Sequence, residues 1–326
     1  MPRARMSCSL AMWIRPKEED VRARHEEALA CLENGDLTGA RSIAEELRGI
    51  GWSGAFEILA LAARAEKDVA GAVHVLDEGC ALAPGAWSLH ELRGTLLDTM
   101  GEPARALDAY ASALRCEGVW EASVRYNRAI TLWRTGDAGG ALADAEAVLS
   151  GATPPPFAVD AVRVAIDALD RLGRRTDAVS LVRTALGDAS GDDHVTLRLR
   201  ELLAIALGRD GQLDAARTEA RAVIEAGRGT TEFARLLPPI AFDARPARWL
   251  RLVVQGRVSG QGFLRVVGVL AADANEGLAW ATQLEPEASR ERLEVDECRD
   301  NDAPMPPEGT PRGIVGASGR IFFDET

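Results

Sequence analysis

The chain has 326 residues, of which 47% are hydrophobic and only 5% aromatic, with Ala and Leu dominating. This length can bury a large core, and the composition favours closely packed helices over a β-sandwich. The formal net charge of -12 repels phosphate backbones, and residues 21–230 carry no basic stripe to offset it, so nucleic-acid binding is not expected.

Residues 1–20 are predicted to be a disordered leader. An apolar run from Leu10 to Ile14 follows two arginines, as in a secretion signal, but it is short and no small-residue cleavage site follows it. Met12 is a second candidate for the true start. No stretch approaches the roughly 20 apolar residues that span a bilayer. We therefore expect no membrane contact and a cytoplasmic location, which the five scattered cysteines without CxxC spacing also favour.

Residues 21–230 contain six repeats. The repeat starts are Val21, Ser53, Trp87, Ala122, Val159 and Leu197, spaced by 32, 34, 35, 37 and 38 residues. The twentieth place is alanine in every repeat: Ala40, Ala72, Ala106, Ala141, Ala178 and Ala216. The eighth place is small in five repeats and Ile166 in the fifth. Small residues at both places predict a close crossing of two helices, and Ile166 predicts a splayed fifth pair.

Turn signals separate the two helices of each repeat. They are Asn34-Gly35-Asp36, Gly101-Glu102-Pro103, Gly136-Asp137, Gly173 and Asp210-Gly211-Gln212. Glycine ends the first helix where a left-handed conformation is needed, and the Asp or Pro after it begins the second helix. The second repeat has Lys67-Asp68 instead, which is a weaker stop.

Three stretches resemble the tetratricopeptide repeat (TPR) family. They are LRGTLLDTMGEPARALDAYASAL at 92–114, YNRAITLWRTG at 126–136, and Ala81-Leu82-Ala83-Pro84. The resemblance covers about residues 21–230, with fewer large aromatic residues than the family usually has. It implies a mainly α fold, a right-handed α-solenoid of about six TPR-like helix hairpins. The first helix of each hairpin would then line a concave groove that binds a segment of another protein.

The fourth repeat would place aromatic residues in that groove. Tyr126, Ile130 and Trp133 are spaced four and three residues apart, so they share one helix face, with Asn127 and Arg134 beside them. Central aromatics with polar neighbours are typical of a peptide-binding hot spot. The alternative is that these side chains pack against neighbouring helices, since aromatic stripes at helical spacing usually belong to a core.

Charged residues of two other repeats are predicted on the same surface. They are Glu91 and Asp98 in the third repeat and Asp160, Arg163 and Asp167 in the fifth. A mixed, somewhat acidic groove favours a ligand that carries Arg or Lys, whereas the alternative is that these charges only keep a solvated face soluble. Capture of a terminal carboxylate is not supported, because the Lys, Asn and Arg cluster that relatives use is missing.

Residues 231–247 are predicted to be a linker and residues 248–326 a small two-layer α/β domain of order ββαββ. The first strand is Trp249–Val258, with Leu250, Leu252, Val254 and Val258 on one side, and the second is Phe263–Ala272. Asp273 and Glu276 predict a capping box for a helix through Leu284. A third strand at Arg292–Cys298 and a hairpin at Ile314–Phe323 complete the sheet.

The first two strands of this domain are basic, and the rest of the domain is acidic. We predict internal pairing on one sheet face, with Arg251, Arg257 or Arg265 opposite Glu294 or Asp296. The alternative is that the basic strand pair meets an acidic partner.

No sequence motif for chemistry is present. GxxxxGK, GxSxG, HExxH and GxGxxG are absent and the four histidines stand alone, so no catalytic, cofactor or metal site is predicted. The leading hypothesis is a non-catalytic scaffold or adaptor that binds a protein or peptide. The alternatives are a regulatory or immunity-type inhibitor that uses the acidic C-terminal domain, and an enzyme with an unrecognised site in that domain. A homo-oligomer is left open.

Overall fold

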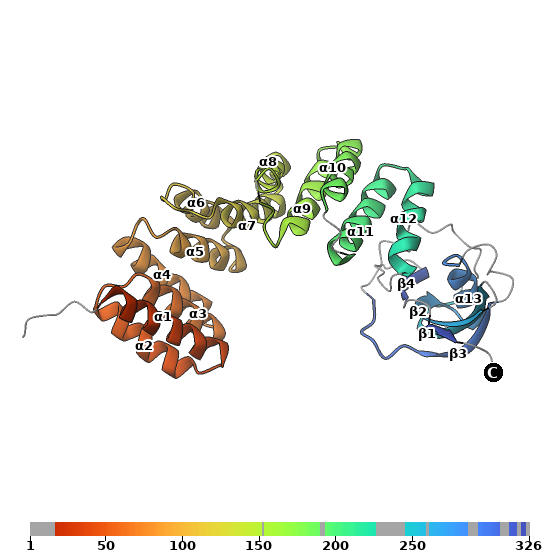
Figure 1. Ribbon diagram of the computed structural model, residues 1–326, viewed down its shortest axis with the longest axis horizontal. Helices are drawn as coiled ribbons and strands as arrows, with labels where there is room; N and C mark the ends of the chain where they lie inside the picture. The colour runs from red at the N-terminus through yellow and green to blue at the C-terminus, as the bar shows by residue number, and fades with distance from the viewer. Residues whose placement is uncertain are drawn as a thin grey trace, which may run out of the picture. The chain divides into compact units, whose positions relative to one another are not determined.

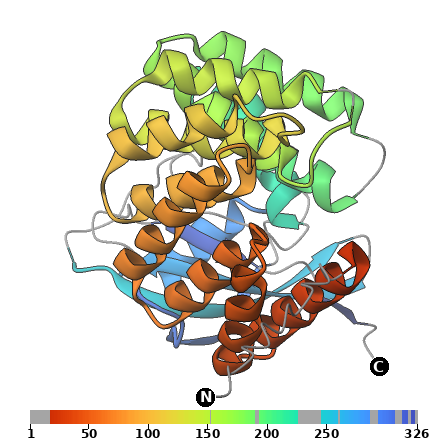
Figure 2. The same ribbon diagram turned by 90° about the vertical axis from the view of Figure 1, so that its left-hand side faces the viewer.

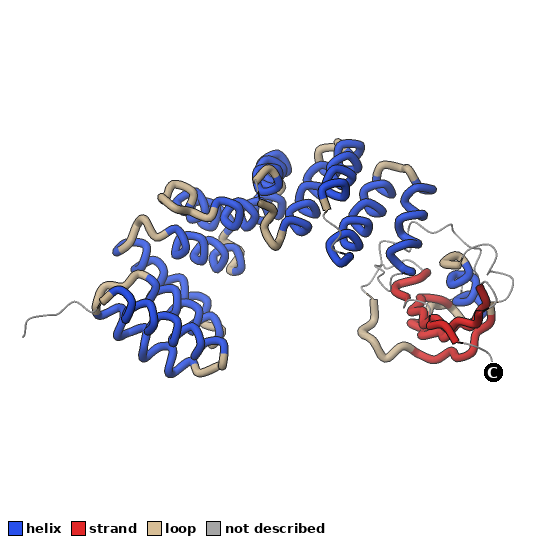
Figure 3. Tube along the Cα trace, viewed as in Figure 1, coloured by secondary structure: helices blue, strands red, loops and turns tan. Residues whose placement is uncertain are grey.

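The computed structural model describes residues 17–151, 153–189, 193–225, 245–258, 261–285, 293–306, 313–317 and 321–323. Helices fill the first part of the chain, and a small sheet with one helix lies at its end (Figures 1 and 3). The chain divides into two compact units, Met1–Thr153 and Pro154–Thr326, and each is described by itself. Among the described helices, none has both the length and the hydropathy to cross a membrane.

The first unit contains four helix hairpins (Figure 2). They are α1 (Glu18–Glu33) with α2 (Leu37–Gly49), α3 (Gly54–Ala65) with α4 (Val69–Leu82), α5 (Trp87–Thr99) with α6 (Pro103–Ala113), and α7 (Glu121–Thr135) with α8 (Ala138–Leu149). Each helix packs on the next along the chain, and the first helices of successive hairpins also contact one another. The helices α1, α3, α5 and α7 therefore form one continuous row.

The second unit begins with two more hairpins. They are α9 (Ala158–Arg171) with α10 (Arg175–Asp188), and α11 (Asp193–Arg209) with α12 (Leu213–Glu225). The first helices α9 and α11 again contact each other. Among the described hairpins, α9 and α10 pack on each other least extensively. This agrees with the splayed fifth pair that the sequence predicts. Ile166 is fully buried there, and it is larger than the Ala or Gly that the other hairpins carry at the same place.

The alanines of the twentieth place are buried, which the predicted close crossings require. Ala40, Ala72, Ala106, Ala141 and Ala216 are 0% exposed and Ala178 is 2% exposed. In the third hairpin the facing residue is Gly94, and a Cβ added there would lie 2.6 Å from Cε1 of Tyr110. The ring of Tyr110 thus fills the space that a larger residue at position 94 would need.

The turns within the hairpins also follow the prediction. Gly35, Gly101, Gly136, Gly173 and Gly211 all have φ between 72° and 94°. Lys67 has φ 68° at the corresponding place, and it is the single non-glycine residue with positive φ in the described structure. The turn of the second repeat therefore has the same left-handed geometry as the others, although Lys67 adopts it less easily than glycine.

An aspartate caps three of the second helices, and the sequence analysis begins two of them at the same residue, Asp36 and Asp137, without predicting the side-chain hydrogen bonds. The side chains of Asp36, Asp68 and Asp137 accept hydrogen bonds from the backbone N–H three residues later, at 2.8–2.9 Å. Each accepted N–H belongs to a glycine that precedes the crossing alanine, as in Asp36-Leu-Thr-Gly39-Ala40. A repeated Asp-x-x-Gly-Ala pattern could have revealed these caps.

The end of the second unit is a five-stranded antiparallel sheet with one helix. The strands are β1 (Arg248–Val258), β2 (Gln261–Ala271), β3 (Glu294–Asp300), β4 (Gly313–Ala317) and β5 (Ile321–Phe323), with α13 (Ala274–Thr282) between β2 and β3. The strand order is β3-β1-β2-β4, and β5 also pairs with β2. Leu250, Leu252 and Val254 are buried as predicted. The cap is as predicted too, because Asp273 accepts from the N–H groups of Asn275 and Glu276.

The predicted hairpin at Ile314–Phe323 is wrong. Both β4 and β5 run antiparallel to β2, so they run in the same direction, and they pair with successive parts of β2. Together they occupy one position beside β2, which keeps the ββαββ order of the domain. The physical reason is that β2 is long enough, at 11 residues, to pair with both short strands end to end.

Ion pairs within the sheet are present, but not with the predicted partners. The strand register places Arg265 opposite Val254, on the buried face, whereas Arg251 lies on the other face opposite Gly268. Arg251 meets Glu297 at 3.9 Å and Arg248 meets Asp300 at 2.7 Å. In the described ion pairs, neither Glu294 nor Asp296 is the partner of Arg251, Arg257 or Arg265. The domain boundaries at 230 and 247 stay predictions, because most of residues 231–247 lie outside the described ranges.

Arg265 forms a buried ion pair in the core of the domain. Its Nε lies 3.3 Å from Oε1 of Glu285, just after α13, and the two side chains are 1% and 2% exposed. On the same face, α13 packs through Gly277, where an added Cβ would lie within 3.0 Å of Leu252. The pair thus joins the middle of β2 to the chain that leaves α13.

We expect Lys67→Gly to raise the free energy of unfolding by about 1 kcal/mol, because glycine has no Cβ to clash at a left-handed φ. The urea midpoint measured by circular dichroism checks this. Lys67→Ala is the control, because it removes the charge and keeps Cβ. If alanine stabilised the chain as much as glycine, the backbone explanation would be wrong.

We expect Gly94→Ala to destabilise the chain by about 1–3 kcal/mol, because its Cβ overpacks against Tyr110. The matched control is Gly49→Ala in α2, where an added Cβ meets nothing within 4 Å. The control should be neutral or slightly stabilising. Combining Gly94→Ala with Tyr110→Leu should cost less than the sum of the two single changes, and strict additivity would contradict the proposed contact.

We expect Glu285→Ala to cost about 3–5 kcal/mol, because it removes one partner of a buried ion pair. The double change Arg265→Met with Glu285→Leu should recover most of this loss. Asp300→Ala, which breaks the exposed pair with Arg248, is the control and should cost less than about 1 kcal/mol. Thermal unfolding of the three variants measures the difference, and equal losses for Glu285→Ala and Asp300→Ala would rule out a special role for burial.

Candidate functional site

The predicted site residues all lie on first helices of the hairpins. Tyr126, Asn127, Ile130, Trp133 and Arg134 are on α7, Glu91 and Asp98 on α5, and Asp160, Arg163 and Asp167 on α9. The contact between α5 and α7 brings together the residues of the first unit, here called the α5–α7 surface. The contact between α9 and α11 forms a second one, the α9–α11 surface.

Polar contacts cross the α5–α7 surface. Glu91 Oε1 accepts hydrogen bonds from Ser123 Oγ at 2.5 Å and Asn127 Nδ2 at 2.9 Å. About two turns further along, a guanidinium nitrogen of Arg134 donates to Asp98 at 2.5 Å. Both carboxylates that were predicted to attract a basic ligand therefore already have partners on the next first helix.

Three large apolar side chains on one face of α7 form a stripe of intermediate exposure. Tyr126, Ile130 and Trp133 are each half-buried, whereas Val124 and Ala129 on the same helix are fully buried. The stripe, called here the α7 stripe, thus contributes to packing between helices and also reaches the surface. Its burial agrees with both the hot-spot interpretation and the core interpretation, so neither is decided.

A buried carboxylate on α8 fixes the other side of α7. Asp144 accepts two hydrogen bonds from Arg128, at 2.6 and 2.7 Å, and one from Arg125 at 3.2 Å. This bidentate contact raises the pKa of the Arg128 guanidinium, mainly through its hydrogen bonds to Asp144. The sequence interpretation missed this clamp, although two arginines three residues apart on α7 facing one buried Asp could have suggested it. The clamp orients the α7 stripe.

The α9–α11 surface is also crossed by ion pairs. Asp160 pairs with Arg198 at 2.5 Å, and Asp167 pairs with Arg209 at 2.6 Å and with Arg163 at 3.6 Å. Arg198 and Arg209 on α11 belong to this network, whereas the predicted site residues of this surface are all on α9. Acidic residues seven apart on α9 and arginines eleven apart on α11 each fall on one helix face, which is the signal that could have identified the network.

A hollow of about 270 Å³ opens on this surface. Its wall carries Asp160, Glu201, Arg163 and Arg198, and its floor is formed by the buried residues Val159 and Leu202. Two carboxylates and two guanidinium groups balance in formal charge. The hollow therefore offers both hydrogen-bond donors and acceptors over an apolar floor. Its formal charges cancel, so it favours neither anionic nor cationic ligands.

Comparison with known proteins gives structural matches alone. No protein-family model matches the chain, and no curated protein matches it. A tetratricopeptide repeat protein from Parabacteroides merdae is 15% identical over 66% of this chain and 82% of its own, with a TM-score of 0.50. The pilF protein of Pseudomonas aeruginosa is 14% identical over 66% of this chain and 95% of its own, with a TM-score of 0.52. The chain is therefore mainly helical, and its helical repeats have the tetratricopeptide repeat fold.

Proposed function

We propose that the chain is a non-catalytic scaffold or adaptor that binds a segment of another protein on its first-helix surfaces. The observation that carries the proposal is the α7 stripe, where Tyr126, Ile130 and Trp133 remain partly exposed on a helix fixed from behind by Asp144. Rigid aromatic side chains that are already ordered lose little conformational entropy on binding, so they suit a hot spot.

The ion pairs between first helices refine the expected ligand. Glu91 and Asp98 are engaged by α7, and Asp160 and Asp167 by α11. A basic ligand would have to break these pairs to reach the carboxylates, so charge contributes little to affinity. We propose that the partner segment carries apolar side chains toward the α7 stripe, with the paired charges forming a polar rim.

The inhibitor alternative draws less support from the C-terminal domain. It needs acidic side chains that are available to a basic target. Two of the acids on β3, Glu297 and Asp300, instead contact Arg251 and Arg248 of the neighbouring strand. An adaptor that uses its helical surfaces is therefore the better supported of the two functions.

We expect the double change Tyr126→Ala and Trp133→Ala to weaken binding of the partner at least about thirtyfold, because two hot-spot side chains are removed. The partner is first isolated on the full-length wild-type chain from the organism's own lysate, purified, and then titrated calorimetrically. Trp120→Ala is the matched control, since Trp120 precedes α7, is 49% exposed and lies outside the stripe.

Two further measurements separate binding from folding. Thermal unfolding should show that both variants remain folded at the titration temperature. Glu91→Gln should leave the affinity within about threefold, since an amide oxygen still accepts from Ser123 and Asn127. A double variant that stays folded and binds as tightly as the wild type would mean that the stripe is only core.

A further inference from the structure

The strand β3 forms one edge of the C-terminal sheet. In the strand order β3-β1-β2-β4 it pairs with β1 on one side, and no other described strand pairs with it (Figure 1). Every residue of β3 is exposed except Val295, which is of intermediate exposure. An edge strand of this kind presents backbone N–H and C=O groups to which another strand can add.

The direction of the backbone groups shows which residues of β3 face the open edge. The N–H of Asn301 donates to the carbonyl oxygen of Trp249 at 2.9 Å, so the backbone groups of Asn301 point toward β1. In an antiparallel ladder both groups of one residue point to the same side, and the side alternates along the strand. The register is regular over this stretch. The backbone groups of Arg299 therefore point toward β1, and those of Cys298 point toward the open edge.

Few of the features that protect sheet edges occur in the regular part of β3. Proteins block edges with Pro, Lys, bulges or covering elements. The strand contains no Pro and no Lys, and its bulge lies before Glu297. It carries four acids against one Arg, but Glu297 and Asp300 already contact Arg251 and Arg248 of β1. Residues 297–300 therefore form a regular open edge whose charges are largely balanced.

On the face of the sheet away from α13, one arginine of β3 lies opposite another arginine. Arg299 is directly opposite Arg251 of β1, and Glu297 lies 3.2 Å from the first and 3.9 Å from the second. Like charges in opposite positions are destabilising, and a single carboxylate here serves two guanidinium groups. A second carboxylate on the open side of Arg299 would relieve this imbalance.

A second copy of β3 can supply that carboxylate in one symmetric register. Two copies related by a two-fold axis pair around one residue that lies opposite its own counterpart. Pairing centred on Glu297 or on Arg299 would place two like charges directly opposite each other. Pairing centred on Cys298 places each Arg299 opposite a Glu297 of the other copy, and the outward backbone groups of the two cysteines bond to each other. Asp300 then lies opposite Asp296 of the other copy, but its charge is balanced by the ion pair with β1.

We propose that the chain forms a symmetric homodimer through β3, in which the two edge strands pair antiparallel with Cys298 at the two-fold axis. The two five-stranded sheets then form one continuous sheet. The contact is limited to residues 296–300 of each strand, so it belongs to the small and weak interfaces. Monomer and dimer are therefore in equilibrium at roughly micromolar concentrations. The dimer presents the helical repeats twice, which raises the avidity for a multivalent partner.

Sedimentation velocity and disulfide trapping test the dimer on the full-length reduced chain. Sedimentation from roughly 1 to 200 μM should show a shift from monomer to dimer. Diamide then accepts two electrons as two thiols join, and peptide mass spectrometry should identify Cys298 to Cys298 as the main link between chains. Burial raises the pKa of the Cys298 thiol, so the trapping is done above neutral pH. Cys298→Ser should remove the link and leave the sedimentation unchanged.

Charge reversal tests the register. Arg299→Glu alone and Glu297→Arg alone should each weaken dimerisation about tenfold, because two pairs of like charges replace two ion pairs. An equal mixture of the two variants should restore dimers that contain one copy of each, since Glu then lies opposite Arg at both places. Two affinity tags identify these mixed dimers. Glu294→Arg lies outside the paired stretch and is the matched control, which should not weaken the dimer.

These variants also separate pairing from folding and from the helical surfaces. The side chains of Glu297 and Arg299 are 48% and 52% exposed, so each variant should stay folded in thermal unfolding. The double change Tyr126→Ala and Trp133→Ala should leave dimerisation unchanged. A chain that stays monomeric over the whole range, a dimer that neither reversal weakens, a mixture without mixed dimers, or trapping mainly at other cysteines would each overturn the proposal.

Discussion

The close crossing of two helices at a buried alanine is the constraint on which the rest of the structure depends. A buried alanine occupies this place in all six hairpins, and in the fifth the facing residue is the larger Ile166. Because each hairpin is thin, its first helix can contact the first helix of the next hairpin. The rows of first helices, and with them both candidate surfaces, follow from this one packing rule. In the third hairpin, Gly94 extends the rule by making room for the ring of Tyr110.

The rows of first helices are held together by polar groups as well as by packing. Contacts such as Arg134 to Asp98 and Arg209 to Asp167 join neighbouring first helices on the surface where a ligand would lie. Charges used in this way contribute to the register of the repeats and contribute less to attraction of a partner. The acidic sequence therefore overstates how acidic the candidate surfaces are. Recognition on them depends more on shape and apolar contact, which the α7 stripe can supply.

The sequence predicted what depends on local pattern. The period, the alanines at the crossings, the left-handed turns and the alternation of β1 all follow from residues close together in the chain. The placement of Tyr126, Ile130 and Trp133 on one face of α7 follows in the same way. Their half-burial does not, because it depends on the distance to helices whose exact packing the period leaves open.

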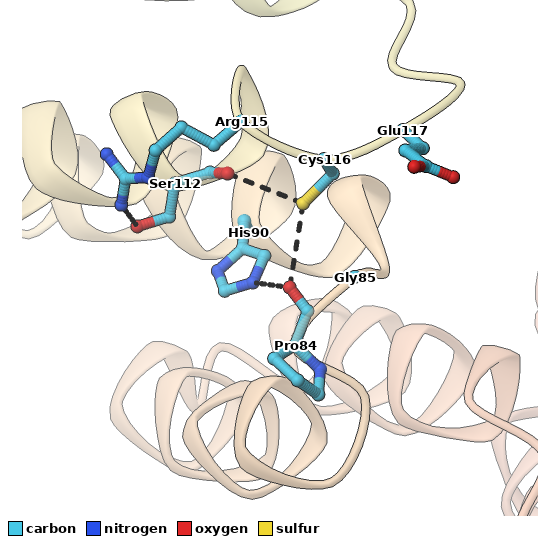
Figure 4. A pocket seen from close by; sticks show the side chains of 7 residues that line it. All are labelled: Pro84, Gly85, His90, Ser112, Arg115, Cys116 and Glu117. Atoms are coloured by element: carbon cyan, nitrogen blue, oxygen red, sulfur yellow. Dashed lines mark hydrogen bonds between the residues drawn. The ribbon is translucent and has the colours of Figure 1, made fainter.

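What the sequence interpretation missed depends on contacts between distant residues. Arg265 was predicted to share a sheet face with Arg251 and to pair with Glu294 or Asp296, but the register of β1 with β2 places it on the buried face, where it pairs with Glu285. The Asp144 clamp needs α8 to cross α7 at one particular angle. A hollow of about 590 Å³ between the turn after α4 and the turn after α6 brings His90 and Cys116 to one carbonyl oxygen, that of Pro84, although the sequence shows only an isolated histidine and a scattered cysteine (Figure 4). A shift of one residue in how two neighbouring elements align would alter each of these contacts, while the repeat length in the sequence would stay the same.

Repeat arrays are stabilised mainly by each hairpin and its nearest neighbours, so cooperativity along them is limited and local unfolding can begin at a weak member. The α9–α10 hairpin, with Ile166 at its crossing, packs least extensively of those described. Its amide hydrogens are therefore expected to exchange with solvent sooner than those of the alanine-crossed hairpins. One branched side chain would then decide where this chain opens first, and where a protease gains its first access to the backbone.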